Sequence, residues 1–140
     1  MKSHVEFRSE LFPPYEDEEE QINPGRYGKR VAEFIVNGLK ESEFNPEELI
    51  PEDWGWVVPI ENQEFNLWIG CGNYEEYPNG FLCFIEPHKP EIRKFPFFRK
   101  TSTVSTVNKL REALNNILSS NPGIEGITWH THDEFSNPSS

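Results

Sequence analysis

Three consecutive apolar segments in the middle of the chain constrain its fold more than any other feature. They read GWVVPIE, FNLWIGCGN and GFLCFIEP, and only the short stretches ENQE and YEEYPNG separate them. Each segment alternates with the two-residue period of a strand. Connections this short can join only antiparallel neighbours, so the sequence predicts a three-stranded meander over residues 55–87.

The alternation also predicts which side chains share a face of the meander. A four-residue loop at ENQE sets Ile60 opposite Phe65 and Trp54 opposite Cys71, because successive side chains point to opposite faces. The second hairpin sets Cys71 opposite Cys83. The two registers agree on one side, which we expect to lie under the helices.

The reverse face of the meander is apolar where a solvent-facing side would be polar. It carries Trp68 and Phe84 beside Gly70 and Gly72, and the glycines leave a shallow space that permits close approach. Three interpretations are open: cover by the FPP or RKFPFF segment, a dimer interface, or a site for a ligand or protein partner. Trp68, Gly70 and Phe84 are therefore candidate binding residues.

Amphipathic helices are predicted on either side of the meander. Apolar residues recur at helical spacing over residues 26–40 and again over 101–120. Asn45, followed by Pro46 and two glutamates, is typical of the N-terminus of a helix and predicts one further helical turn there. VEFRSE near the start and IEGITWHT near the end alternate like half-buried strands.

The element order is thus strand, helix, three-strand meander, helix, strand. It predicts an α+β two-layer sandwich, with a mainly antiparallel sheet and two helices on one face. The length suits a single domain over residues 1–140. Within it we expect an acidic loop near 13–24 and a frayed tail near 133–140.

Cysteine usage and the lack of an export signal favour the cytoplasm. The start MKSHVEFRSE has no apolar core of a signal peptide, and no run approaches the ~20 residues that span a bilayer. Cys71 and Cys83 match no CxxC pattern, so packing of reduced thiols is the favoured interpretation. A cross-strand disulfide and a catalytic or metal role are the alternatives.

The charge is strongly acidic and unevenly placed. The formal net charge is -11, and residues 1–60 carry 14 acidic and 6 basic side chains. Phosphate backbones repel such a protein, so general nucleic-acid binding is disfavoured, whereas a basic partner would be attracted. The acidic side chains at 16–20 repel one another and cannot be buried, so we predict a solvated loop or a docking patch there.

The string WHTHDE offers the one candidate metal site. His130 and His132 lie on the same side of the predicted strand, with Asp133 next to them, and imidazole and carboxylate are common ligands. Ile127 and Trp129 mark the opposite, buried side, which leaves the histidines in solvent. We therefore predict no metal and no other cofactor, with His130 and His132 as weak candidates.

Basic and aromatic residues interleave in HKPEIRKFPFFRK, where Arg93 and Lys94 are candidate binding residues. Such a segment can stack bases and neutralise phosphate, or bind an anion or an acidic partner. The overall charge opposes nucleic acid. The phenylalanines can instead anchor the connection into the second helix.

The chain resembles a group of small uncharacterised bacterial proteins in four short strings, HVEFRS, EDWGW, LWIGCG and FLCFIEP. The resemblance covers most of the chain. It implies a bacterial origin and one domain, and it brings no activity and no functional residue.

The sequence holds no phosphate-cradling glycine loop, no Gly-x-Ser-x-Gly elbow and no kinase-like signature. We therefore expect a non-enzymatic cytoplasmic binding or accessory protein, for example an immunity-like protein that neutralises a basic partner. It would act through the Trp68/Phe84 face or the acidic first half, on another protein or on itself, without a membrane. The alternative is a small-molecule binder or enzyme with a pocket between the sheet and residues 88–100.

Overall fold

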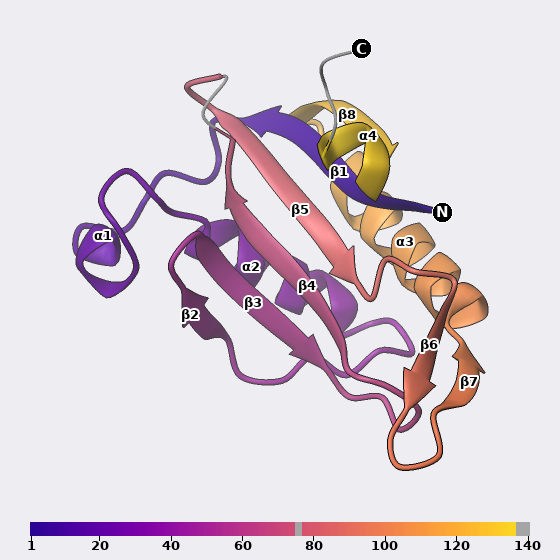
Figure 1. Cartoon of the computed structure of the whole chain (residues 1–140). Helices are drawn as coiled ribbons and strands as arrows, with labels where there is room; N and C mark the ends of the chain where they lie inside the picture. Colours follow the sequence, from indigo (N-terminus) through magenta and orange to yellow (C-terminus); the bar gives the residue numbers. More distant parts are fainter. Residues whose placement is uncertain (75–76, 137–140) are drawn as a thin grey trace.

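A computed structural model describes residues 1–74 and 77–136 of the chain (Figure 1). Its helices and strands follow one another as β1 Lys2–Ser9, α1 Glu18–Gln21, α2 Lys29–Leu39, β2 Ile50–Glu52, β3 Gly55–Ile60, β4 Leu67–Asn73, β5 Gly80–Glu86, β6 Glu91–Lys94, β7 Arg99–Ser102, α3 Val104–Ser119, β8 Ile124–Thr131 and α4 His132–Ser136.

The main sheet has the strand order β2-β3-β4-β5-β1-β8, and every neighbouring pair is antiparallel. Both long helices cover the same face of this sheet, α2 over β3 and β4 and α3 over β5 and β8 (Figure 1). The predicted α+β two-layer sandwich is confirmed. We call the other side of the sheet, away from α2 and α3, the open face.

The core lies between the sheet and the two helices. The helices bury one stripe each, as their apolar spacing predicts. The fully buried side chains of this stripe are Val31, Ala32, Ile35 and Leu39 from α2 and Val107, Leu110, Leu114 and Leu118 from α3. They pack against inward-facing residues of every strand of the meander and of β1.

The predicted register is confirmed for one hairpin and wrong for the other. Cys71 pairs with Cys83 between β4 and β5, as the alternation predicts. Between β3 and β4, however, Ile60 pairs with Leu67 rather than Phe65, a shift of two residues. The reason is a longer loop, in which Phe65 is buried and its carbonyl accepts a hydrogen bond from Asn62 Nδ2 at 3.0 Å.

This shift changes the position of one tryptophan. Trp56, not Trp54, pairs with Cys71 on the core side. Trp54 precedes β3, in the turn after β2, and lies against the open face. Six of the predicted inward residues of β3 and β4 keep their side despite the shift, because a slip of two residues preserves the face: Trp56, Val58, Ile60, Leu67, Ile69 and Cys71.

Two predicted local features are wrong. Residues 45–49 form no helical turn, because they run beside the end of β3: Glu47 N donates to Pro59 O and Glu61 N donates to Asn45 O. Residues 133–136, expected in a frayed tail, belong to α4. The rest of that tail, 137–140, lies outside the described residues.

The acidic loop also differs from expectation, because one of its carboxylates is buried. Glu18, in α1, is only 1% exposed, while its neighbours Glu19 and Glu20 lie in solvent. Its carboxylate accepts the backbone N–H groups of Gly28 and Lys29 at 2.7 and 2.8 Å. The acidic run is therefore attached to the start of α2.

The cysteines of the central hairpin are free and fully buried. Burial, together with the adjacent Cys83 thiol, raises the pKa of Cys71 well above its ordinary value, so little reactive thiolate forms.

We therefore expect iodoacetamide to leave both thiols of the native protein unmodified and to alkylate both in urea. Mass spectrometry over time measures this, with glutathione in the same reaction as an internal control for reagent activity. Rapid labelling of Cys71 in the native protein would contradict the packing role.

Candidate functional site

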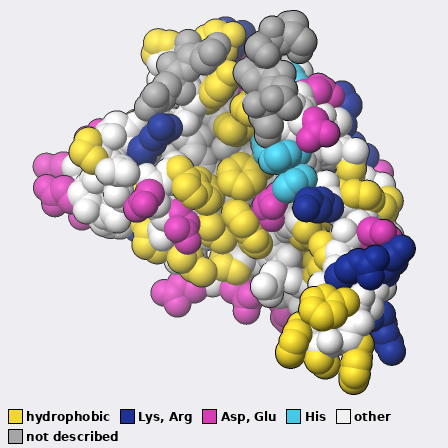
Figure 2. Space-filling model, viewed as in Figure 1, with side chains coloured by type: hydrophobic (Ala, Val, Ile, Leu, Met, Phe, Trp, Pro, Cys, Tyr) yellow, Lys and Arg dark blue, Asp and Glu magenta, His cyan; other side chains and the backbone are white. Residues whose placement is uncertain are grey.

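The open face carries a cluster of three aromatic side chains, which we call the aromatic cluster. Phe84 on β5 contacts Trp54 and Trp68, with ring centroids 5.2 and 5.6 Å apart, and the two tryptophans stack at 6.3 Å. All three side chains are partly exposed. Figure 2 shows hydrophobic side chains gathered in the middle of this face, with acidic ones beside and below them.

Gly70 makes this arrangement possible. A Cβ at Gly70 would lie 2.4 Å from Cζ of Phe84 and 2.8 Å from Cη2 of Trp54. The rings therefore rest directly on the backbone of β4, and the predicted close approach is made by another part of the chain, Trp54. Neither the FPP segment nor RKFPFF supplies this cover, because Phe12 packs with Phe34 at the core and the phenylalanines of RKFPFF are exposed to solvent.

Next to the aromatic cluster runs a groove of about 610 Å³, over β2, β3 and the start of β4. Apolar side chains line it, among them Ile50, Trp54, Val57, Pro59 and Trp68, together with the polar Asn62 and Asn66. Three carboxylates line the same groove, Glu47, Glu52 and Glu61, and no lysine or arginine does so among the described residues. We call it the acid-rimmed groove.

The other half of the open face holds all four histidines of the chain. His88 and His132 stack at a centroid distance of 3.8 Å, and His4 lies 5.5 Å from His132. Phe135 of α4 packs against both His4 and His130. We call His4, His88, His130 and His132 the histidine cluster; histidine side chains appear in cyan in Figure 2, beside the hydrophobic centre.

Carboxylates surround three of these histidines. His88 Nδ1 lies 2.5 Å from Glu86 Oε1, and His130 lies between Glu6 at 3.2 Å and Glu134 at 3.4 Å. His132 Nδ1 lies 3.6 Å from Asp133 Oδ1. His4 is different: it is buried, it stacks on Phe84, and its Nδ1 meets the Ser3 hydroxyl at 2.9 Å. Burial, and then the adjacent histidines, lower the pKa of His4 from 6.5 to about 4.

The weak metal candidates do not come together as ligands. His130 belongs to β8 and turns toward Glu6, whereas His132 begins α4 and stacks on His88. Within residues 1–74 and 77–136, no group of three or more His, Cys, Asp or Glu is placed to hold a metal ion.

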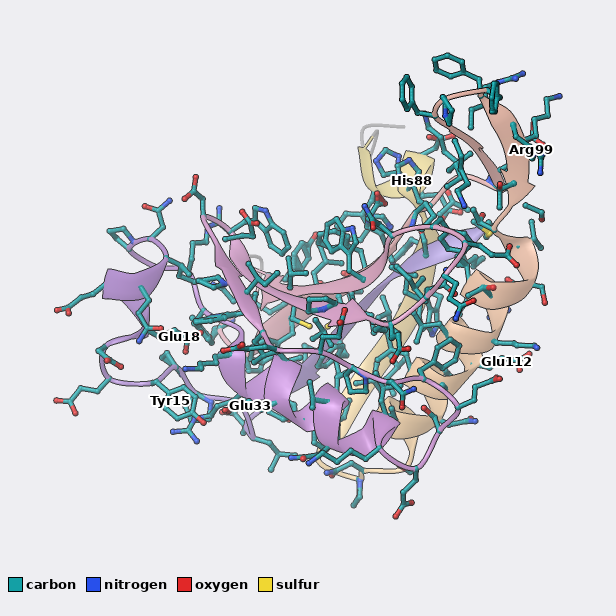
Figure 3. All side chains as sticks on the ribbon, turned by 90° about the horizontal axis from the view of Figure 1, so that it is seen from below. Tyr15, Glu18, Glu33, His88, Arg99 and Glu112 are labelled. Carbon is teal, nitrogen blue, oxygen red and sulfur yellow. The ribbon has the colours of Figure 1, made fainter. Side chains whose placement is uncertain are left out.

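Residues 91–102 form a separate two-stranded hairpin of β6 and β7, which carries Arg93 and Lys94. The phenylalanines of its turn do not anchor α3. Phe95 and Phe97 are 84% and 85% exposed, and Phe98 is 59% exposed. We call these three residues the aromatic tip. Figure 3 shows that the hairpin, with Arg99, rises beyond the sheet on the side of the open face, where His88 also lies.

A hollow of about 530 Å³ separates this hairpin from the loop between β3 and β4. Phe65, Ile92, Lys94 and Phe95 are among its lining residues. It borders residues 88–100, as the expected pocket does, but its other side is the loop at 62–66 and not a strand of the main sheet. The open face thus runs from the acid-rimmed groove, past this hollow, to the hairpin.

The structure brings together Trp68, Gly70 and Phe84 but places Arg93 and Lys94 apart from them, on the hairpin. Sequence reasoning missed Trp54 and His4. The alternation of β1 indicates that His4 points to the other face from the inward Val5. Only the pairing of His4 with Phe84, between β1 and β5, shows that it lies on the open face beside the aromatic cluster.

Comparison with known proteins adds no relative: no family model, no curated protein and no solved structure matches the chain. Among the described helices, none combines the length and apolar character needed to cross a membrane.

Proposed function

We propose that the protein acts by binding another protein through its open face, with the aromatic cluster and the acid-rimmed groove as the contact surface. The observation that carries this proposal is the partly exposed arrangement of Trp54, Trp68 and Phe84 beside an apolar groove. Aromatic residues in such patches dominate the energetics of protein interfaces.

The groove supports a partner of a particular chemistry. Its apolar walls favour aliphatic or aromatic side chains, and Glu47, Glu52 and Glu61 favour Lys or Arg next to them. The overall charge of -11 would also attract a basic protein from a distance. An accessory or immunity-like protein that neutralises a basic partner is one form of this function.

A random peptide library displayed on phage tests the proposal without a known partner. We expect selection on the purified protein to enrich peptides that combine apolar residues with Lys or Arg. Trp68→Ala should weaken the selected peptides at least about tenfold, because it removes a central aromatic contact. Thermal unfolding of this variant checks that it is folded.

Ile50 and Leu11 provide a matched pair for the same assay. Both side chains are 47% exposed, but only Ile50 lines the acid-rimmed groove. We expect Ile50→Ala to weaken peptide binding and Leu11→Ala to leave it unchanged. Equal binding by all variants, or no enrichment at all, would count against the open face as a binding surface.

The second candidate function is small-molecule binding in the hollow between the hairpin and residues 62–66, favoured by its volume of about 530 Å³. A thermal-shift screen of metabolites tests it. A ligand of this hollow should lose its effect in Lys94→Ala and keep it in Trp68→Ala.

A further inference from the structure

The aromatic tip and the acid-rimmed groove are complementary, and both belong to the same chain. We propose that two copies of the protein associate by docking the aromatic tip of one into the acid-rimmed groove of the other. This inference deepens the proposed function and rests on it, because it names a second copy of the chain as one occupant of the same groove.

The tip has the character of a group that becomes buried on association. Three phenylalanines lie within four residues of a projecting turn, and the two most exposed reach 84% and 85%. Phe98 has a φ of 52°, which is unusual for a bulky residue, and its carbonyl accepts a hydrogen bond from Arg93 Nη1 at 3.3 Å. The backbone is therefore strained at Phe98, in a turn whose three phenylalanine rings lie in solvent.

Local charge agrees with the apolar match, whereas the net charge of -11 on each copy opposes association at long range. Residues 89–100 carry five basic side chains and one acidic one, Glu91, which lies 3.8 Å from Lys100. The groove contributes Glu47, Glu52 and Glu61. When the hairpin docks into the groove, basic groups therefore lie beside acidic ones around an apolar centre. Complementary charges of this kind set the orientation of two partners at an interface.

Within one molecule, the aromatic tip is not buried against any other described part of the chain. Phe95 lines the hollow next to the loop between β3 and β4, but the tip remains exposed, and no residue of the hairpin lines the acid-rimmed groove. The hairpin rises on the same side as the open face (Figure 3). When two molecules face each other, the tip of each can therefore dock into the groove of the other. The two contacts are identical, so the result is a dimer with two-fold symmetry.

Sedimentation velocity over a wide range of concentration tests the proposal. We expect the wild-type chain to form a reversible particle of twice its 16.4 kDa mass. A tip variant, Phe95→Ser with Phe97→Ser, and a groove variant, Glu47→Lys with Glu52→Lys, should each dimerise at least about tenfold more weakly. All four positions are exposed, so both variants should fold, and Leu11→Ala serves as the unaffected control.

Mixing the two variants gives the decisive result. The tip variant retains its groove and the groove variant retains its tip, so the mixture should form a heterodimer through one contact, detected by labelling one component. A wild-type protein that stays monomeric, a dimer that both variants leave intact, or a mixture that does not associate would overturn the inference. Peptide binding that still depends on Trp68 in a monomeric protein would leave the proposed function standing.

Discussion

Replacing Glu18 with alanine is expected to lower the free energy of unfolding by about 3 to 5 kcal/mol. The buried carboxylate accepts four N–H groups, from the backbone of Tyr15, Gly28 and Lys29 and from the indole of Trp56, at 2.7 to 3.0 Å. Each donor left unsatisfied in the interior costs about 1 to 3 kcal/mol.

Glu18 also caps the N-terminus of α2. The N-cap residue, Gly28, has no side chain that could accept a hydrogen bond, and Glu18 supplies the acceptor from ten residues away. Its negative charge lies at the positive end of the α2 dipole, which adds to the stabilisation. Removal of this one group thus loosens α1, α2 and β3 together.

Urea unfolding followed by tryptophan fluorescence measures the effect. Glu19→Ala is the matched control, since Glu19 is the exposed neighbour in the same acidic run and should change stability by about 0.5 kcal/mol or less. Glu18→Gln should fall between the two, because it keeps one acceptor oxygen. If Glu18→Ala is no more destabilising than Glu19→Ala, the buried role of this carboxylate is wrong.

Acidification is expected to destabilise the protein through His4. The pKa of His4 is about 4 in the folded state and 6.5 when unperturbed, so the unfolded chain binds the proton more readily between these values. The contribution of neutral His4 is fully present above pH 6.5 and is lost as the pH falls toward 4. Relative to neutral pH, the stability lost through His4 amounts to about 2 kcal/mol at pH 5 and about 3 kcal/mol at pH 4.

His4→Phe isolates this contribution. Phenylalanine keeps a ring against Phe84 and Phe135 but cannot bind a proton. Loss of the contact with the Ser3 hydroxyl adds an offset that does not vary with pH. Between pH 7 and pH 5, the wild type should lose about 2 kcal/mol more stability than the variant. Equal losses in urea unfolding at the two pH values would show that His4 is not the group responsible.

The sequence predicted the layers of the fold and one hairpin well, because these depend on local alternation. Cys71 and Cys83 face each other as their spacing indicates. The β3–β4 register could not be obtained in the same way, since nothing in ENQEFN tells a four-residue loop from a longer one that buries Phe65. That difference determines whether Trp54 belongs to the core or to the open face.

The site was predictable only in part, for a similar reason. Trp68, Gly70 and Phe84 follow from the alternation of two neighbouring strands. Glu18 cannot be told from the other glutamates of its run by sequence, because its role depends on donors from α2 and β3. The histidine cluster gathers residues from β1, β8, α4 and the connection after β5, and only the long-range strand order brings them together.

The position of β1 has a consequence for how the molecule forms. β1 lies inside the sheet, paired with β5 on one side and β8 on the other, although it is synthesised well before either. The strand that carries Val5 and Phe7 therefore pairs with residues of β5, about 75 positions later in the chain, and of β8, about 120 positions later. Pairing between such distant segments slows folding. During translation β1 has no partner until β5 is made, and its other edge stays unpaired until β8 is made, which exposes a strand edge that can associate prematurely.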